Sequence, residues 1–180
     1  MLTPYTRKEL MASLMENLLE VLDREETKYE ELVKLEYEKK EILIKGDVPA
    51  LEKMTDREQD VSSVLRNLEI RREKIMDDMS TVLGKKKSEL TIKYMIGILD
   101  KQPDEQARLS ELREKLRATL SEMSQINELN RMLTEQAIEL VEYDLNLIKS
   151  MRQAPQTANY DRDALGTGDI LPSRGFDAKQ

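Results

Sequence analysis

The chain has 180 residues, of which 36% are charged and only 4% are aromatic, and its formal net charge is -7 at pH 7. This composition is typical of long amphipathic helices and excludes a thick globular core rich in aromatic side chains. Because phosphate binding needs a surplus of lysine and arginine on one face, the acidic balance also argues against nucleic acid as the main partner. We therefore expect a thin helical protein that binds other proteins.

Cysteine and histidine are absent, which removes the common thiolate and imidazole ligands of metal ions and the most frequent general base of enzymes. No glycine-rich loop follows a predicted strand, the pattern that holds cofactor phosphates. We expect no enzymatic activity, no cofactor and no metal. The N-terminal residues lack the basic-then-apolar order of a secretory signal, and no apolar run approaches the ~20 residues that a membrane helix needs. We therefore expect a soluble, cytoplasmic protein.

Two long helices are predicted in the first half of the chain, over residues 6–45 and 48–83. The first follows from apolar residues at three- and four-residue spacing, and it ends at Gly46, since glycine readily adopts the left-handed conformation of a helix terminus. Asp47 and Pro49 suit the first turn of the second helix. Because the connection is short, the two helices are predicted to run antiparallel.

The second helix carries the most regular heptad repeat of the chain. Its apolar row consists of Met54, Val61, Leu68, Ile75 and Val82. A companion row is apolar at Leu51, Leu65 and Met79 but is interrupted by Glu58 and Arg72. A repeat of seven residues predicts the seam of a left-handed coiled coil.

Two further helices are predicted, a short one over residues 88–100 and a long one over residues 104–152. The short helix is apolar around most of its circumference, so we expect the bundle or another chain to cover it. Together these elements predict an all-α fold, an elongated antiparallel helical hairpin or coiled-coil bundle of three long helices and one short helix. The single bundle domain is predicted to span residues 1–152, and a flexible tail follows over residues 153–180.

In the long final helix, the apolar seam weakens towards the C-terminal end. One heptad row carries the apolar residues Leu112, Ile126, Leu133, Leu140 and Leu147. The neighbouring row begins with Leu116 and Met123 but continues with Asn130, Ala137 and Asp144. A seam that becomes polar is a place where a partner helix can enter. An alternative stays open, in which Asn130 only fixes helix register and the leucines pack against the first two helices.

The tail contains the only phenylalanine of the chain, Phe176, among prolines and glycines that do not continue a helix. An aromatic ring in such a segment has little packed core to join, so its apolar surface is available to a partner. Two alternatives stay open for Phe176: it is a second docking element, or it is a latch that folds back over the short helix.

Residues 125–148 read QINELNRMLTEQAIELVEYDLNLI, and the tail contains NYDRDALGTG and FDAKQ. Together with the N-terminal hairpin and its Lys-Gly-Asp turn, these segments resemble the FlgN family of flagellar export chaperones. The long C-terminal helix of that family carries an element that corresponds here to Asn127, Leu129 and Asn130, followed by Leu133 and Gln136. Its loose tail carries a tyrosine near glycine, which corresponds here to Tyr160.

The resemblance implies a cytoplasmic chaperone that binds hook-associated proteins of the FlgK and FlgL type and prevents their premature assembly. It also implies delivery of this cargo to FlhA, the export gate component of flagellar type III secretion, so the membrane is reached only indirectly. We expect the cargo to cover an apolar face of the final helix as a helix-in-groove contact. The expected cargo-binding residues are Ile126, Asn127, Asn130, Leu133, Ala137, Leu140 and Leu147. The resemblance assigns Tyr160 to the export gate.

An alternative from another class is a structural scaffold whose coiled coil forms a stable oligomer. A scaffold would use the same heptads, but its seam would stay apolar through position 144, where this chain has Asp144. Assembly at increasing concentration separates the two classes, since a chaperone is expected to be a monomer or a weak dimer and a scaffold an obligate assembly.

Overall fold

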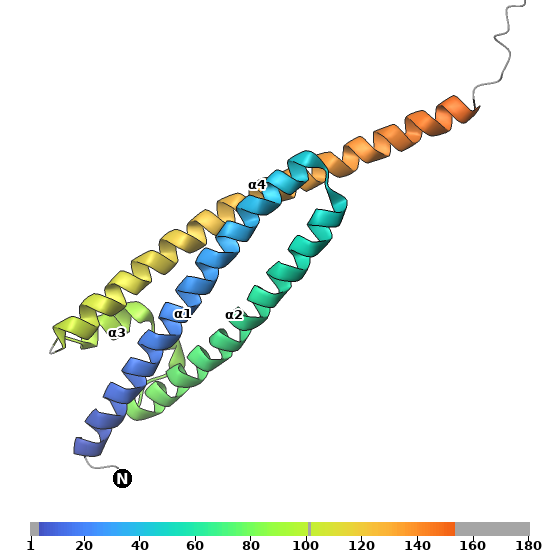
Figure 1. Cartoon of the computed structure of the whole chain (residues 1–180). Coiled ribbons are helices and arrows are strands. Elements are labelled where there is room, and N and C mark those ends of the chain that lie inside the picture. The colour runs from blue at the N-terminus through green and yellow to red at the C-terminus, as the bar shows by residue number, and fades with distance from the viewer. Residues whose placement is uncertain (1–3, 101, 154–180) are drawn as a thin grey trace, which may run out of the picture. The chain divides into compact units, whose positions relative to one another are not determined.

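The computed structural model describes residues 4–100 and 102–153, with side chains placed over residues 7–100 and 102–152. Its elements are four α-helices and one 3-10 turn (Figure 1). They are α1 (Pro4–Lys45), α2 (Val48–Leu83), the 3-10 turn η1 (Lys87–Glu89), α3 (Ile92–Ile98) and α4 (Pro103–Gln153). The predicted all-α fold of three long helices and one short helix is confirmed. None of the described helices is long and apolar enough to cross a membrane.

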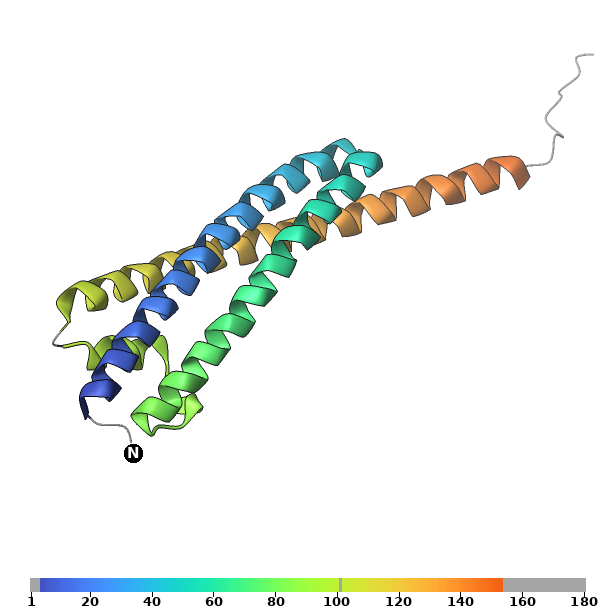
Figure 2. The same cartoon turned by 60° about the horizontal axis from the view of Figure 1, so that its bottom comes forward.

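The chain divides into two units, Met1–Leu140 and Val141–Gln180. The packed helices belong to the first unit. In Figure 1, α1 lies between α2 and the first part of α4, and in Figure 2 the same part of α4 crosses behind α1. Side-chain hydrogen bonds join α1 to α2, through Glu25 and Arg72, and to α4, through Glu36 and Asn130.

A tight turn joins α1 to α2 as the sequence predicts. Gly46 has a φ of +65°, in the left-handed region that glycine adopts without steric cost. A side-chain oxygen of Asp47 then accepts a hydrogen bond from the backbone N–H of Ala50 at 3.1 Å, which caps the start of α2. Ion pairs between Glu20 and Arg71 and between Glu38 and Arg57 show that the helices run antiparallel.

The apolar seam between α1 and α2 forms two hydrophobic clusters. The larger one joins the first half of α1 to the second half of α2, to α3 and to the start of α4, and its most completely buried side chains are Leu18, Val21, Met79, Met95 and Leu109. The smaller one lies towards the α1–α2 turn and contains Leu32, Leu35, Met54, Val61 and Leu65. Both clusters contain members of the predicted heptad row of α2, because that row faces α1.

The two charged residues that interrupt the companion row of α2 pair with residues of α1. Arg72 Nε donates a hydrogen bond to the buried carboxylate of Glu25 at 3.0 Å. Lys39 Nζ lies 3.0 Å from the carboxylate of Glu58. Each interruption of the apolar row is therefore a polar contact between the two helices.

The short element is divided into two parts, whereas the sequence analysis expects one helix over residues 88–100. Thr91 has an extended backbone, and its hydroxyl accepts a hydrogen bond from the N–H of Tyr94 at 3.1 Å, so a new helix begins there. The 3-10 turn η1 ends just before this cap. Leu90, Met95 and Leu99 are buried in the larger cluster, so the bundle covers the apolar face of this element.

Candidate partner-binding surfaces

The first half of α4 packs against the bundle through one side of the helix. Its buried side chains are Leu109, Leu112, Ile126 and Asn130. Leu116 and Met123 are partly buried against the same clusters. Among the described residues, no side chain after Asn130 is buried. The part of α4 that follows Asn130 therefore has surface available to a partner.

A polar cluster ties α4 to α1 at this level. The side-chain nitrogen of Asn130 donates to the backbone oxygen of Glu36 and to its carboxylate, each at 2.8 Å. With its amide nitrogen turned towards α1, Asn127 donates to the two oxygens of the same carboxylate, at 2.8 and 3.1 Å. Because the side chain of Glu36 is buried, these donors replace the water that the charge has lost. We call Glu36, Asn127 and Asn130 the asparagine clamp.

Residues 141–152, the described helical part of the second unit, leave every side chain exposed. Half of these residues are large and apolar: Val141, Tyr143, Leu145, Leu147, Ile148 and Met151. Tyr143 and Met151 keep 65% and 70% of their surface in contact with solvent. Large apolar side chains exposed in this number along one helix are typical of a site of protein interaction.

The expected cargo-binding residues differ in how deeply they are buried. Ile126 and Asn130 are buried, and the exposed Asn127 is bound to Glu36 in the asparagine clamp. Leu133 and Ala137 are partly buried, whereas Leu140 and Leu147 are exposed, Leu140 by 62%. The cargo role of these residues stays a prediction. Tyr160 and Phe176 lie outside the described residues.

The sequence analysis missed an apolar stripe formed by Val141, Leu145 and Ile148. These residues follow one another at spacings of four and three, which places them on one side of a helix. At 100° per residue they lie about a third of a turn away from Leu140 and Leu147. Their spacing is visible in the sequence, but they lie off the heptad row that continues the seam of the bundle.

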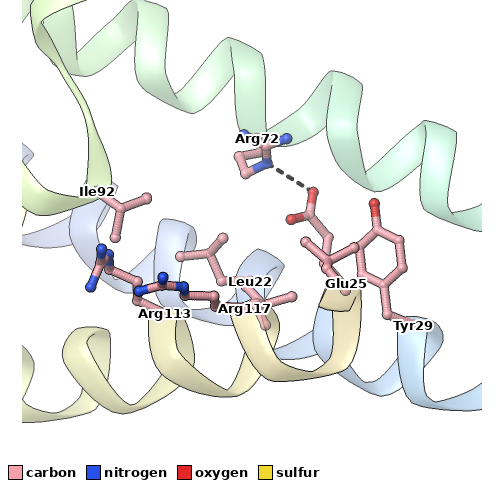
Figure 3. A pocket seen from close by; sticks show the side chains of 9 residues that line it. Leu22, Glu25, Tyr29, Arg72, Ile92, Arg113 and Arg117 are labelled. Carbon is pink, nitrogen blue, oxygen red and sulfur yellow. Dashed lines mark hydrogen bonds and ion pairs between the residues drawn. The ribbon is translucent and has the colours of Figure 1, made fainter. Parts of the chain in front are cut away.

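A cleft lined by residues of α1, α2, α3 and α4 was not predicted from the sequence. Its volume is about 440 Å³, and its apolar lining includes Leu22, Tyr29, Ile92, Leu116 and Leu120. Three arginines and one glutamate supply its charges: Arg72, Arg113, Arg117 and Glu25. Figure 3 shows Arg113 and Arg117 near one another on α4, while Glu25 points from α1 towards Arg72. We call this surface the arginine cleft.

Glu25 is the buried acid of the arginine cleft. Burial raises the pKa of its carboxyl above the ordinary value of 4.5, and the Arg72 guanidinium acts in the opposite direction. A carboxylate paired with an arginine is an arrangement for holding helices or for recognising a partner. Among the described residues no cluster of acids has the arrangement of a metal site.

The fold defines an all-α helical bundle, and residues 141–152 of α4 carry exposed apolar side chains. A family model described as FlgN protein matches residues 11–165, so the chain belongs to the FlgN family. Membership implies a flagellar export chaperone that binds hook-associated proteins, and chaperones of this family are non-enzymatic. No curated protein and no solved structure matches the chain.

Proposed function

We propose that this protein holds hook-associated proteins of the FlgK and FlgL type unassembled in the cytoplasm and delivers them to FlhA at the export gate. Family membership supports the class of activity. The observation that carries the proposal for this chain is the exposed apolar surface of α4, which includes Leu140 and Leu147. Subunits that assemble through helices carry apolar faces that need cover before export, and an exposed apolar helix is suited to that task.

Leu140 and Leu147 are the residues best placed for the cargo contact. Both are exposed and lie on one heptad row, so an incoming helix can bury them together. Each leucine contributes about 1.5 to 3 kcal/mol when fully buried, before the cost of ordering the partner is subtracted. Ile126 and Asn130 contribute differently, because they are already packed against the bundle and hold the start of this surface in place.

The test is a double substitution, Leu140→Asp with Leu147→Asp, measured by calorimetric titration with a hook-associated protein of the FlgK type. Because bound cargo is expected to bury both leucines, their replacement is expected to weaken cargo binding by about a hundredfold or more. Ile44→Asp with Ile70→Asp is the matched control, since both isoleucines are exposed on the hairpin and the charge change is the same. Circular dichroism should show the same helix content in both variants. Equal cargo affinity in the two variants would place the cargo site elsewhere.

Contact with the export gate is assigned to Tyr160. A tyrosine offers a large apolar ring with a polar end, which suits a shallow pocket on a partner. Tyr160→Ala is expected to weaken binding of the cargo-loaded chaperone to the cytoplasmic part of FlhA and to leave cargo affinity unchanged, and Tyr160→Phe should retain most of the binding. Loss of cargo binding in Tyr160→Ala would contradict this division of roles.

A further inference from the structure

The arginine cleft has the chemistry of a site for an acidic amphipathic helix. Its lining is apolar, and its charged residues are three arginines against one glutamate, in a chain with a net charge of -7. Arginines thus outnumber acids in the lining and lie beside apolar surface, although Arg72 pairs with Glu25 and Arg113 also pairs with the neighbouring Glu114. Arg113 and Arg117 are one helical turn apart on α4, a spacing that meets carboxylates on a neighbouring helix.

The length of the arginine cleft suits about two turns of helix. Its lining runs from Leu22 to Tyr29 on α1 and from Arg113 to Leu120 on α4. Each of these spans covers seven steps along the helix, or about 10 Å at 1.5 Å per residue.

The chain itself contains a helical segment with the matching properties. Val141, Leu145 and Ile148 form an exposed apolar stripe that also spans about 10 Å of helix. Residues 139–148 contain three acids and no basic residue: Glu139, Glu142 and Asp144. At 100° per residue, Glu142 and Asp144 lie on opposite sides of the stripe. The stripe is thus apolar in its centre and acidic at its borders.

We propose that the arginine cleft of one copy of this chain binds the segment 139–148 of a second copy. Val141, Leu145 and Ile148 fill the apolar lining, and Glu142 and Asp144 meet Arg113 and Arg117. Burial of the stripe supplies most of the affinity, and the charge pairs select the partner and the direction of approach. The contact weakens as salt concentration rises, because both arginines and both acids lie near solvent.

Charge reversal on the full-length chain tests the proposal by sedimentation velocity at about 1 to 100 μM protein. The wild type is expected to self-associate within this range. Arg113→Glu with Arg117→Glu is expected to weaken self-association by about tenfold or more, and Glu142→Arg with Asp144→Arg should do the same. An equimolar mixture of the two variants should associate again, because each supplies the charges that the other has lost. Arg66→Glu with Lys74→Glu, at exposed positions of α2, is the matched control and should behave as the wild type.

A photoreactive amino acid at position 120 locates the contact. In a mixture of isotopically light and heavy chains, it should capture a peptide containing residues 141–148 of the other copy, whereas the same amino acid at exposed position 70 should not. A wild type that stays a 20.9 kDa monomer over the whole range overturns the proposal. So does an associated wild type whose charge-reversed variants associate equally well, or whose cross-links from position 120 fall outside residues 139–148.

The proposal stands apart from cargo binding, because it uses Val141, Leu145 and Ile148 rather than Leu140 and Leu147. A protein that self-associates through the arginine cleft but ignores hook-associated proteins would contradict the proposed function alone. A protein that binds cargo but stays monomeric would contradict the cleft contact alone. A result that contradicts one proposal therefore does not contradict the other.

Discussion

At the scale of single residues, charged side chains inside the bundle form ion pairs that join one helix to another. Glu58 and Arg72 break the apolar companion row of α2, and each has an oppositely charged partner on α1. The Arg72 partner, Glu25, keeps only 5% of its surface exposed, so its charge depends on that arginine. Removing one partner of such a pair leaves a buried charge without compensation.

Glu25 is predicted to make stability depend on pH. Its pKa is raised in the folded chain, mainly by burial, so the folded state binds the proton more tightly than the unfolded state. Its contribution to the free energy of unfolding is therefore largest below the ordinary value of 4.5 and is lost as pH rises through the folded pKa. Relative to Glu25→Gln, which keeps a hydrogen-bond acceptor for Arg72, the wild type is expected to lose stability between about pH 4 and about pH 7.

Urea unfolding of both proteins at the two pH values measures this difference, and Glu16→Gln, at an exposed position of α1, is the control. A stability difference between wild type and Glu25→Gln that stays constant over the range would show that burial does not perturb this carboxyl.

Asn130 is predicted to be a structural residue of the α1–α4 contact. Asn130→Ala removes two hydrogen bonds to Glu36 and leaves a buried carboxylate with fewer donors. The expected loss in free energy of unfolding is about 1 to 3 kcal/mol, measured by urea denaturation. Gln125→Ala, at an exposed position of the same helix, should change stability little. Unchanged stability in Asn130→Ala would return this residue to the expected cargo surface.

At the scale of elements, helix ends follow from a few residues with special backbone geometry. α2 ends where Gly84 adopts a φ of +64°, and the backbone N–H groups of Gly84 and Lys85 bond to the last carbonyls of the helix. α3 begins at Thr91 because its hydroxyl caps the helix. These local signals explain why the short element is divided although its apolar residues are continuous.

Gly84→Ala is predicted to destabilise the protein by about 1 to 2 kcal/mol, because a left-handed backbone crowds the Cβ of alanine. Gly97→Ala is the matched control, since Gly97 lies within α3 and a Cβ at either glycine would meet no atom within 4 Å. In that helix alanine is expected to be neutral or to stabilise by about 0.5 to 1 kcal/mol. Thermal unfolding followed by circular dichroism compares the two variants, and equal effects would mean that backbone conformation does not govern the end of α2.

At the scale of the whole molecule, the described chain separates residues that stabilise it from residues available to partners. The buried side chains of the described residues all lie between Leu14 and Asn130. Those of residues 141–152 are exposed, and half of them are large and apolar. FlgN family membership assigns the chain to the chaperones rather than to the structural scaffolds that the heptads alone also allow.

A chain that ends at Leu140 is predicted to keep its folded bundle and to lose cargo binding. It retains every buried side chain of the described residues but lacks Leu147. Its midpoint of thermal unfolding is expected to stay within about 5 °C of the full chain, because no apolar contact of the clusters is removed. Circular dichroism and calorimetric titration with a hook-associated protein measure the two properties. An unfolded truncated chain would show that residues after Leu140 stabilise the bundle.

The sequence alone determined the helical class, the approximate limits of the long helices and the family resemblance, since these depend on local signals. Heptad spacing, the glycine at position 46 and the cap at Asp47 act within a few residues of one another. Tertiary structure decided which side chains meet across the bundle. Asn130 and Glu36 are 94 positions apart, and the arginine cleft contains residues from four helices. Local residue spacing therefore predicts neither the Asn130–Glu36 contact nor the cleft. Such contacts depend on how the faces of separate helices pack. The order of residues within one helix does not specify that packing.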